Sequence, residues 1–395
     1  MITVEEAKSI LIENTFKLIK TSNRKVRNSS GYFLAEDIFS KLDLPPFNQS
    51  NVDGYALKFS DANQWTVIEE IKAGDSPDIK LKSNEAARIF TGAVVPDGAD
   101  CVVMQEEVHV NKDKISLGEK IPAKGEFIRS KGSQIRRGEL AIKQNTMITP
   151  AVSGFLSALG IDRIKVYRKP VVYLIITGNE LQSAGTKLSP GKVYDSNSYI
   201  LESALEQMNI KAKKIIVVKD KKKKLLKIIS QCLPKADLIL ISGGVSVGKY
   251  DFVNEVLEKL GTKKLFYKIS QRPGKPLYFG MNGAAYIFGL PGNPASVLTC
   301  FYEFVYPLLR KMQGYDKYFL EKKKLPVLRE LHKTFRLSNF LKGRTLLNSV
   351  EPLGGQASYI LKSFTDADCF IYLPLDTSHV NAGEEVEVHI LPTVY

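Results

Sequence analysis

The sequence predicts a multidomain protein in which a parallel α/β sheet domain is combined with β domains. Buried-strand segments alternate with helical patterns between residues 170 and 312, which is typical of a parallel sheet with helices on both faces. Short strand-like segments with many turns occupy residues 58 to 138, and turn-rich alternating segments follow from about residue 325. Both of these regions are typical of small β domains.

The composition supports a globular protein with several cores. The chain has 395 residues, of which 44% are hydrophobic and 25% charged, so we expect two to four domains. The first residues, "MITVEEAKSILIENTF", carry acids and resemble no signal peptide. No segment approaches the roughly 18 apolar residues of a membrane span. We therefore expect a cytoplasmic protein that does not associate with membranes.

The net charge of +14 leaves three interpretations open. It suits a nucleic-acid-binding protein, an enzyme for a multiply anionic small molecule, or a lysine-rich surface. The run "KDKKKK" at residues 219 to 224 precedes an apolar helical pattern. We therefore assign most of the excess positive charge to a solvated surface. The sequence has no helix-turn-helix, aromatic stacking motif or zinc finger, and we expect no nucleic-acid partner.

The cysteines and histidines predict neither a disulfide framework nor a structural zinc site. The four cysteines contain no CxxC pair, and the four histidines contain no HxxxH pair. Any metal would therefore be a hard ion held by oxygens.

Capping signals place the first helices. Thr3 and Glu6 form a capping-box pattern at the start of a helix expected over residues 3 to 19. A second helix is expected over 149 to 161, with Thr149 as its cap and Pro150 in its first turn. We expect this helix to rejoin the N-terminal helix, so that the intervening β domain is an insertion. Helices of the α/β region are expected over 198 to 208, 221 to 232 and 252 to 260, and from 294.

Three expected strands of the α/β region end in unusual loops. The strand at 171–176 runs into "TGNEL", the strand at 238–241 into "SGGVSVGKYD", and the strand at 285–290 into "LPGNPAS". Ligands bind at the carboxyl ends of strands in open parallel sheets. Three such loops at one edge therefore predict a binding site.

The second loop has the composition of an oxyanion site. Its small residues leave the backbone N–H groups free to face a phosphate; they are Ser242, Gly243, Gly244, Ser246 and Gly248. Asp251 follows at the start of the next helix. It is either an N-cap or a ligand of Mg²⁺ beside the phosphate.

Two further segments offer anion-binding groups. Arg272 and Lys275 flank a Pro-Gly turn in "QRPGKPLYFG", where they either grip an oxyanion or form a solvated hairpin turn. In "LPGNPAS", residues 291 to 293 (Pro291, Gly292, Asn293) lead into Pro294. Helix-start chemistry explains most of this second segment.

The remaining candidate acids have both local and chemical interpretations. Glu180 and Asp195 are typical turn or cap residues, but with Asp251 they could supply the carboxylates of a Mg²⁺ site. Asp53 in "NVDGYA" and Thr91 in "IFTGAVVP" lie in the inserted β region, where Asp-Gly is also a common turn.

Taken together, the motifs resemble one family over nearly the whole chain. "PFNQSNVDGYA", "RIFTGAVVPDGADCVVMQE", "TGNEL", "YDSNSY", "SGGVSVGKYDF", "RPGKP" and "LPGNPAS" occur in the order seen in molybdopterin molybdenumtransferases of the MoeA type, also known as the gephyrin E domain. The resemblance implies an elongated N-terminal linking region (1–44 with 139–168), an inserted β domain (45–138), an α/β domain like the molybdopterin adenylyltransferases (169–318) and a C-terminal β barrel (325–395).

The resemblance also implies the activity. Members of the family insert molybdate into adenylylated molybdopterin with Mg²⁺ and release AMP. They work as homodimers, with the site formed by the α/β domain of one subunit and the inserted domain of the other. Molybdopterin adenylyltransferase and cofactor-receiving enzymes are possible partners.

The family's site residues fall on matching positions of this chain. Catalytic roles are implied for Asp53, Thr91, Glu180, Asp251 and Lys275. Metal binding is implied for Glu180, Asp195 and Asp251. Substrate binding is implied for Ser242, Gly243, Gly244, Ser246, Gly248, Arg272, Lys275, Pro291, Gly292 and Asn293, and for Arg344 and Ser363 in the C-terminal domain.

One departure from the family pattern motivates an alternative function. Where the family has "GED", this chain has "RRGEL", so Leu140 replaces an acid. The alternative is an altered paralogue that binds molybdopterin or acts as a scaffold without turnover.

Overall fold

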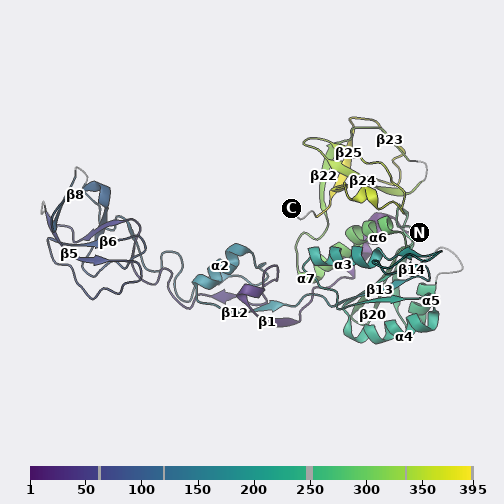
Figure 1. Ribbon diagram of the computed structural model, residues 1–395, viewed down its shortest axis with the longest axis horizontal. Helices are drawn as coiled ribbons and strands as arrows, with labels where there is room; N and C mark the ends of the chain where they lie inside the picture. Colours follow the sequence, from purple (N-terminus) through teal and green to yellow (C-terminus); the bar gives the residue numbers. More distant parts are fainter. Residues whose placement is uncertain (61–63, 119–120, 246–251, 334–335, 393–395) are drawn as a thin grey trace. The chain divides into compact units, whose positions relative to one another are not determined.

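The computed structural model describes residues 1–60, 64–118, 121–245, 252–333 and 336–392, arranged in two compact units. The first unit comprises Met1–Lys20 and Tyr167–Tyr395, and the second comprises Thr21–Val166. Each unit is described by itself below, and Figure 1 labels their elements. Three predicted site residues, Ser246, Gly248 and Asp251, lie outside the described residues.

The first unit is built around a mixed six-stranded sheet. Its strand order is β16-β13-β17-β21-β20-β18, namely Lys214–Val218, Val172–Thr177, Leu238–Ser242, Ala285–Leu290, Tyr278–Asn282 and Lys263–Tyr267. The first four strands are parallel, which confirms the expected α/β architecture. The strands β20 and β18 extend the sheet antiparallel. Residues 278–280, for which the sequence analysis predicted no strand, therefore belong to a buried strand.

Helices cover both faces of this sheet, as the alternation predicts (Figure 1). Leu174 and Ile176 of β13 point into one core with α1 (Val4–Glu13), α3, α6 and α7. Tyr173 and Ile175 point into the other core with α4 and α5. The helices are α3 (Asn197–Gln207), α4 (Lys222–Cys232), α5 (Phe252–Lys259), α6 (Pro294–Cys300) and α7 (Tyr306–Gln313), with a π-helical turn at Phe301–Val305 between the last two.

The N-terminal helix is capped as expected but is shorter. Helix α1 (Val4–Glu13) begins after Thr3, whose hydroxyl accepts the N–H of Glu6 while Glu6 accepts the N–H of Thr3. The helix ends at Asn14, so the expectation that it continues to residue 19 is wrong. The Asn14 and Thr15 side chains donate to the carbonyls of Ile10 and Leu11, at 2.8 and 2.6 Å. These bonds satisfy helix-end carbonyls and favour termination.

The C-terminal part of the first unit is β-rich. Its main sheet has the order β19-β24-β26-β28-β22, namely Gln271–Arg272, Ser338–Thr345, Cys369–Leu373, Glu385–Ile390 and Glu321–Pro326, with β25 (Val350–Pro352) paired to β24. A separate pair joins β23 (Leu331–His332) to β27 (His379–Val380). Because β19 carries Arg272, this sheet begins inside one of the predicted binding segments.

The second unit contains a six-stranded sheet and a helix with short strand pairs. The sheet order is β7-β4-β6-β5-β9-β8, namely Cys101–Met104, Gly54–Leu57, Glu85–Ile89, Trp65–Ile71, Lys114–Leu117 and Val108–Asn111. Helix α2 (Pro150–Ala158) begins after Thr149, whose hydroxyl accepts the N–H of Val152, as expected. The pairs are β1 (Thr21–Lys25) with β12 (Arg163–Tyr167), β2 (Ile38–Phe39) with β11 (Leu140–Ile142), and β3 (Gln49–Ser50) with β10 (Ile128–Arg129).

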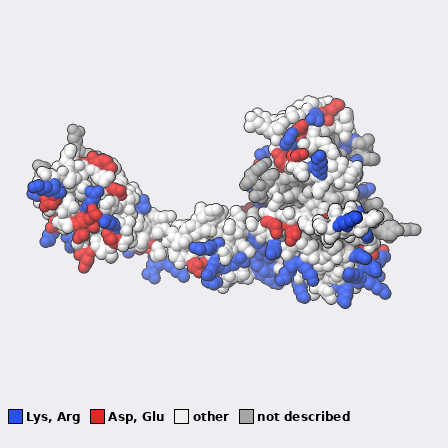
Figure 2. All heavy atoms as spheres, viewed as in Figure 1, with Lys and Arg blue, Asp and Glu red and all other residues white. Residues whose placement is uncertain are grey.

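The lysine run forms a solvated face, as predicted. Lys221 to Lys224 are exposed at the start of α4, whereas Leu225 is buried. Figure 2 shows Lys and Arg gathered over the part of the first unit that holds α4 and α5. Lys222 contacts Glu255 of α5 at 2.5 Å. Within the described residues, no helix is long and apolar enough to cross a membrane.

Candidate functional site

The three unusual loops lie side by side. Strands β13, β17 and β21 are direct neighbours and parallel, so the segments after Thr177, Ser242 and Leu290 leave the sheet at the same edge. The Gly243 N–H donates to the Leu290 carbonyl at 3.3 Å, which ties two of the loops directly. The predicted convergence is therefore confirmed for the described parts of the loops.

Gly243 is required by this close approach. Its φ is +88°, and a Cβ there would stand 2.3 Å from the carbonyl oxygen of Thr177. Any side chain would push the second loop away from the first. Ser242 is fully buried, and its hydroxyl donates to the Pro291 carbonyl at 3.1 Å. The Ser242 hydroxyl thus holds the third loop in place.

Asn197, which we did not predict, joins the second and third loops. Its Nδ2 donates to Ser242 Oγ at 3.0 Å and to the Gly292 carbonyl at 2.8 Å. Its Oδ1, and Oγ1 of Thr177 nearby, are buried without a hydrogen-bond partner among the described residues. Buried polar atoms are usually paired, so these two oxygens are candidate contacts for a bound group. The sequence signal was the Asn of "YDSNSY", two residues after Asp195.

An open cavity of about 600 Å³ adjoins the third loop. It is lined by Val245, residues 271 to 276, Pro291, Gly292, Asn293, Ser296, Leu337 and Ser358. The charged side chains among these described lining residues are Arg272 and Lys275, both exposed. Two cations without a lining carboxylate make the cavity suited to an anion.

The segment that carries Arg272 and Lys275 is held rigidly. Gly274 has a φ of +89°. A Cβ on Gly274 would lie 2.4 Å from Cys300 Sγ, so the turn packs directly on α6. The two cations therefore project from a fixed backbone, and this segment connects β19 of the C-terminal sheet to β20 of the central sheet rather than forming a hairpin turn.

Asn293 contributes differently from the expectation. It is the N-cap residue of α6 by position, with Pro294 in the first turn, but its side chain makes no capping bond. Instead Nδ2 donates to Ser358 Oγ at 2.9 Å. Asn293 thereby ties the third loop to the C-terminal β-rich part, whose Ser358 also lines the cavity.

The proposed metal ligands are only partly described. Glu180 is exposed after β13, and Asp195 is 7% exposed before α3. Both carboxylate oxygens of Asp195 accept bonds from Ser198, from its N–H at 3.1 Å and its hydroxyl at 2.5 Å, as the cap interpretation predicts. Across the described ranges, no three His, Cys, Asp or Glu side chains form a metal cluster. The expected trio includes Asp251, so its role stays a prediction.

In the second unit the structure brings Asp53 and Thr91 together. The Thr91 N–H and hydroxyl both donate to Asp53 Oδ1 at 2.7 Å. These bonds, the N–H first, lower the pKa of the exposed Asp53 carboxyl below its usual value. Asp53 therefore stays ionised at neutral pH, and the pair forms a preorganised polar group on the surface of this unit.

The two predicted site residues of the C-terminal part, Arg344 and Ser363, bind neighbouring groups of the same part. Arg344 pairs with Glu351 at 2.7 Å, and Arg329 pairs with the same carboxylate at 2.8 Å. Ser363 donates to the Gly355 carbonyl at 2.9 Å. Lys342 of the same "LKGR" motif, which we did not single out, is 3% exposed and donates to the carbonyls of Gly355 and Ile360. It fixes the loop that carries Ser358.

Leu140 lies in a strand pair of the second unit. It is opposite Phe39 in the β2–β11 ladder, and the two side chains are 40% and 53% exposed. An apolar cross-strand pair of this kind stabilises a short ladder. The residue that departs from the family pattern is thus accommodated locally.

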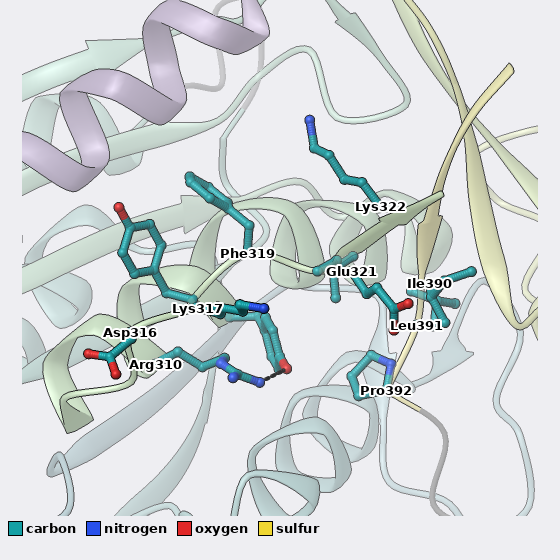
Figure 3. A pocket seen from close by; sticks show the side chains of 12 residues that line it. Arg310, Asp316, Lys317, Phe319, Glu321, Lys322, Ile390, Leu391 and Pro392 are labelled. Atoms are coloured by element: carbon teal, nitrogen blue, oxygen red, sulfur yellow. Dashed lines mark hydrogen bonds between the residues drawn. The ribbon is translucent and has the colours of Figure 1, made fainter. Parts of the chain in front are cut away.

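A further cavity lies near the C-terminal part, away from the loops. It measures about 750 Å³ and lies among α7, the segment at 316–322 and the chain near Pro392 (Figure 3). Arg310 there donates to the Tyr306 hydroxyl at 2.6 Å. The lining mixes Lys317 and Lys322 with Asp316 and Glu321, so its charge does not select an anion as the loop cavity does.

Three family models match almost the whole chain in order. They are the MoeA N-terminal region (domain I and II) at residues 2–160, the probable molybdopterin binding domain at 173–311 and the MoeA C-terminal region (domain IV) at 325–391. A molybdopterin molybdenumtransferase of Haemophilus influenzae is 34% identical over 401 residues, covering 98% of each chain. One from Nostoc is 35% identical over 386 residues, covering 92% of this chain and 87% of the relative.

Solved structures of similar fold also belong to MoeA proteins. Two crystal structures of MoeA proteins of molybdopterin biosynthesis from Pyrococcus horikoshii have TM-scores of 0.84 and 0.81 at 32% and 28% identity, covering 100% and 99% of this chain and 100% of theirs. The fold and the family models thus define a MoeA-type protein. The chain belongs to the molybdopterin molybdenumtransferase family, a family of transferases in molybdenum cofactor biosynthesis.

Proposed function

We propose that this protein inserts molybdate into adenylylated molybdopterin and releases AMP. The observation that carries the proposal is the cavity beside three converging strand-end loops, whose charged lining side chains are Arg272 and Lys275. The names of its relatives, molybdopterin molybdenumtransferases, support the same reaction. Both substrates are oxyanions, so they match a cationic cavity next to backbone amides.

The chain's own residues would act mainly by positioning and charge. Arg272 offers a planar fork for two phosphate oxygens, and Lys275 offers a point charge. Phosphoryl-type chemistry depends chiefly on such preorganised electrostatics. Asn197 and Ser242 would keep the second and third loops at fixed separation while the substrate binds.

A Mg²⁺ ion fits the donor set that we expect near the first loop. Glu180 and Asp195 offer the oxygen ligands that Mg²⁺ prefers, and the unpaired oxygens of Thr177 and Asn197 lie beside the same loops. Asp251 would be the third carboxylate. The ion would neutralise phosphate charge when it binds.

We also propose a cytoplasmic homodimer. Asp53 and Thr91 carry the ionised, hydrogen-bonded group of the second unit, and a second copy would contribute this group to the site. Sedimentation should give about twice the 44.1 kDa chain mass. Molybdopterin adenylyltransferase and cofactor-receiving enzymes stay as candidate partners.

The proposal is tested by AMP release from adenylylated molybdopterin, with and without molybdate and Mg²⁺. Lys275→Ala should raise the KM for this substrate about tenfold or more, because a charge-assisted bond contributes roughly 1.5–3 kcal/mol. Lys227→Ala, which removes an exposed lysine of α4, is the matched control. Unchanged KM in Lys275→Ala would assign this lysine to the surface.

The same assay distinguishes the transferase from the alternative function, a paralogue that binds molybdopterin without turnover. Substrate binding without AMP release under any condition would indicate a binding protein or scaffold. No comparison supports that alternative, and Leu140→Asp would be the variant to examine if release failed.

A further inference from the structure

Two histidines far apart in the sequence meet in the C-terminal β-rich part. His332 of β23 and His379 of β27 are directly opposite in an antiparallel ladder. Their ring centroids are 4.4 Å apart, and their Nδ1 atoms face each other at 3.0 Å. Both side chains are exposed. The function proposed above uses neither of them.

The hydrogen bonds around His379 fix its tautomer. The carboxylate of Glu384 only accepts, and it receives the Asn381 Nδ2 at 2.9 Å and the Asn381 N–H at 2.8 Å. This orients the amide so that Asn381 Oδ1 faces His379 Nε2 at 2.9 Å. His379 must therefore carry a proton on Nε2. In the neutral ring, Nδ1 then presents a lone pair toward His332.

His332 has an acceptor on its outer side as well. Its Nε2 lies 3.6 Å from an oxygen of Glu330. Without a metal, His332 can carry its proton on Nδ1 and donate it to His379. When that proton moves to Nε2, next to the Glu330 carboxylate, both Nδ1 atoms have a free lone pair. A metal ion beside the line between them can then bind both nitrogens at once.

We propose that His332 and His379 form a chelating site for a divalent transition-metal ion of the zinc, nickel or copper class. Imidazole nitrogens bind such ions at about 2.0–2.1 Å, so a 3.0 Å separation corresponds to an N–metal–N angle of roughly 90–100°. This angle suits adjacent positions of an octahedral or square-planar ion and is near the tetrahedral value.

The surroundings match the requirements of a metal-binding histidine pair. Ligating histidines usually donate their second N–H to an oxygen acceptor, which orients the ring and raises its basicity. Asn381 and Glu330 provide these acceptors. Since the described residues offer no third His, Cys, Asp or Glu that completes a cluster, water would fill the remaining positions.

The pair stands next to the loop cavity. His332 and Glu330 line a second cavity of about 330 Å³, which shares Arg272 and Pro273 with the 600 Å³ cavity. A divalent ion at the pair would add positive charge beside a surface already suited to anions. This site is distinct from the Mg²⁺ site expected at the strand-end loops, because its donors are nitrogens.

The test is titration calorimetry of the tag-free full-length protein with ZnCl2, NiCl2 or CuSO4. We expect one equivalent to bind, with MgCl2 giving no signal at this site. His332→Ala and His379→Ala should each weaken binding at least tenfold. Asn381→Ala should weaken it about tenfold through the lost orienting bond. His109→Ala, in the second unit, is the matched control and should leave binding unchanged.

Copper electron paramagnetic resonance gives a second readout. The bound ion should show coupling to two imidazole nitrogens, reduced to one in either histidine variant. Binding of one equivalent that survives both substitutions would place the metal elsewhere and overturn the proposal. Absence of binding by the folded wild-type protein would reduce the pair to a hydrogen bond and overturn it too.

Discussion

Asn197 joins the second and third strand-end loops through one amide group. Its Nδ2 donates to both Ser242 Oγ and the Gly292 carbonyl, and the side chain is 8% exposed. Asn197→Ala removes both bonds and leaves the buried Ser242 Oγ without this donor. An unsatisfied buried group costs about 1–3 kcal/mol. We expect AMP release to fall at least tenfold in kcat/KM.

Glu206→Ala, an exposed change on the same helix, separates the loop effect from helix destabilisation. Asn197→Asp keeps the side-chain shape but removes the two donors, so it should behave like the alanine variant. If both variants retained wild-type kcat/KM, the loops would be held by Ser242 and Gly243 alone.

Sequence patterns identify functional residues by type and spacing, and this explains which ones they miss. The cationic side chains of Arg272 and Lys275 are recognisable as candidates because a Pro-Gly turn lies between them. Asn197 and Lys342 act through backbone carbonyls of distant loops, which no local pattern encodes. His332 and His379 are 47 positions apart, and only strand register brings their rings together.

At the scale of elements, a buried ionic chain links α1, the π-helical turn and β28. Lys8 contacts Glu303 at 2.5 Å, Glu303 contacts His389 Nδ1 at 2.7 Å, and His389 Nε2 contacts Glu387 at 2.8 Å. Lys322 of β22 pairs with Glu387. Burial lowers the pKa of His389, but the charge and hydrogen bond of Glu303, with the bond to Glu387, raise it overall above its usual value.

The stability of this junction should therefore depend on pH. A raised histidine pKa stabilises the folded state fully below the unfolded pKa of about 6.5, and this contribution is lost as pH rises through the folded value. We expect protection of β28 amides in hydrogen exchange to fall above pH 6.5, by up to about 1.4 kcal/mol per pH unit. His389→Gln should remove this dependence, whereas His109→Ala should retain it.

The pH dependence on the acid side provides a check on this assignment of charges. Burial alone would raise the pKa of Glu303, but the charges and hydrogen bonds of Lys8 and His389 lower it to about 2. Its contribution is present above its unfolded pKa and is lost only as pH falls toward 2. A loss of β28 protection already between pH 6.5 and 5 would contradict this assignment of charges.

Element types could be predicted more reliably than element ends and directions. The capping box at Thr3 and the parallel strands around Leu174 follow from local signals. The early end of α1 depends on Asn14 and Thr15 turning their side chains back onto the helix, although Leu18 continues the apolar spacing. The antiparallel direction of β20 depends on pairing with β21, which alternation alone cannot show.

At the scale of the whole molecule, the second unit is one continuous insertion, Thr21–Val166, in the first. The chain leaves and re-enters the first unit at adjacent positions. The Arg168 N–H donates to the Lys20 carbonyl at 2.9 Å, and Lys17 Nζ lies 4.1 Å from the centroid of the Tyr167 ring. A short linker can therefore replace the insertion without displacing α1 from its core.

We expect the first unit, with residues 21–166 replaced by a four-residue Gly-Ser linker, to fold by itself. Its cores are internal, since Val4, Ala7 and Leu11 of α1 pack with the central sheet and α7, and short loops cost little closure entropy. Near-ultraviolet circular dichroism and cooperative thermal unfolding should be retained, while AMP release should be lost with Asp53 and Thr91. An expanded state that binds hydrophobic dye and lacks a near-ultraviolet signal would show instead that the first unit needs the second to form its packed core.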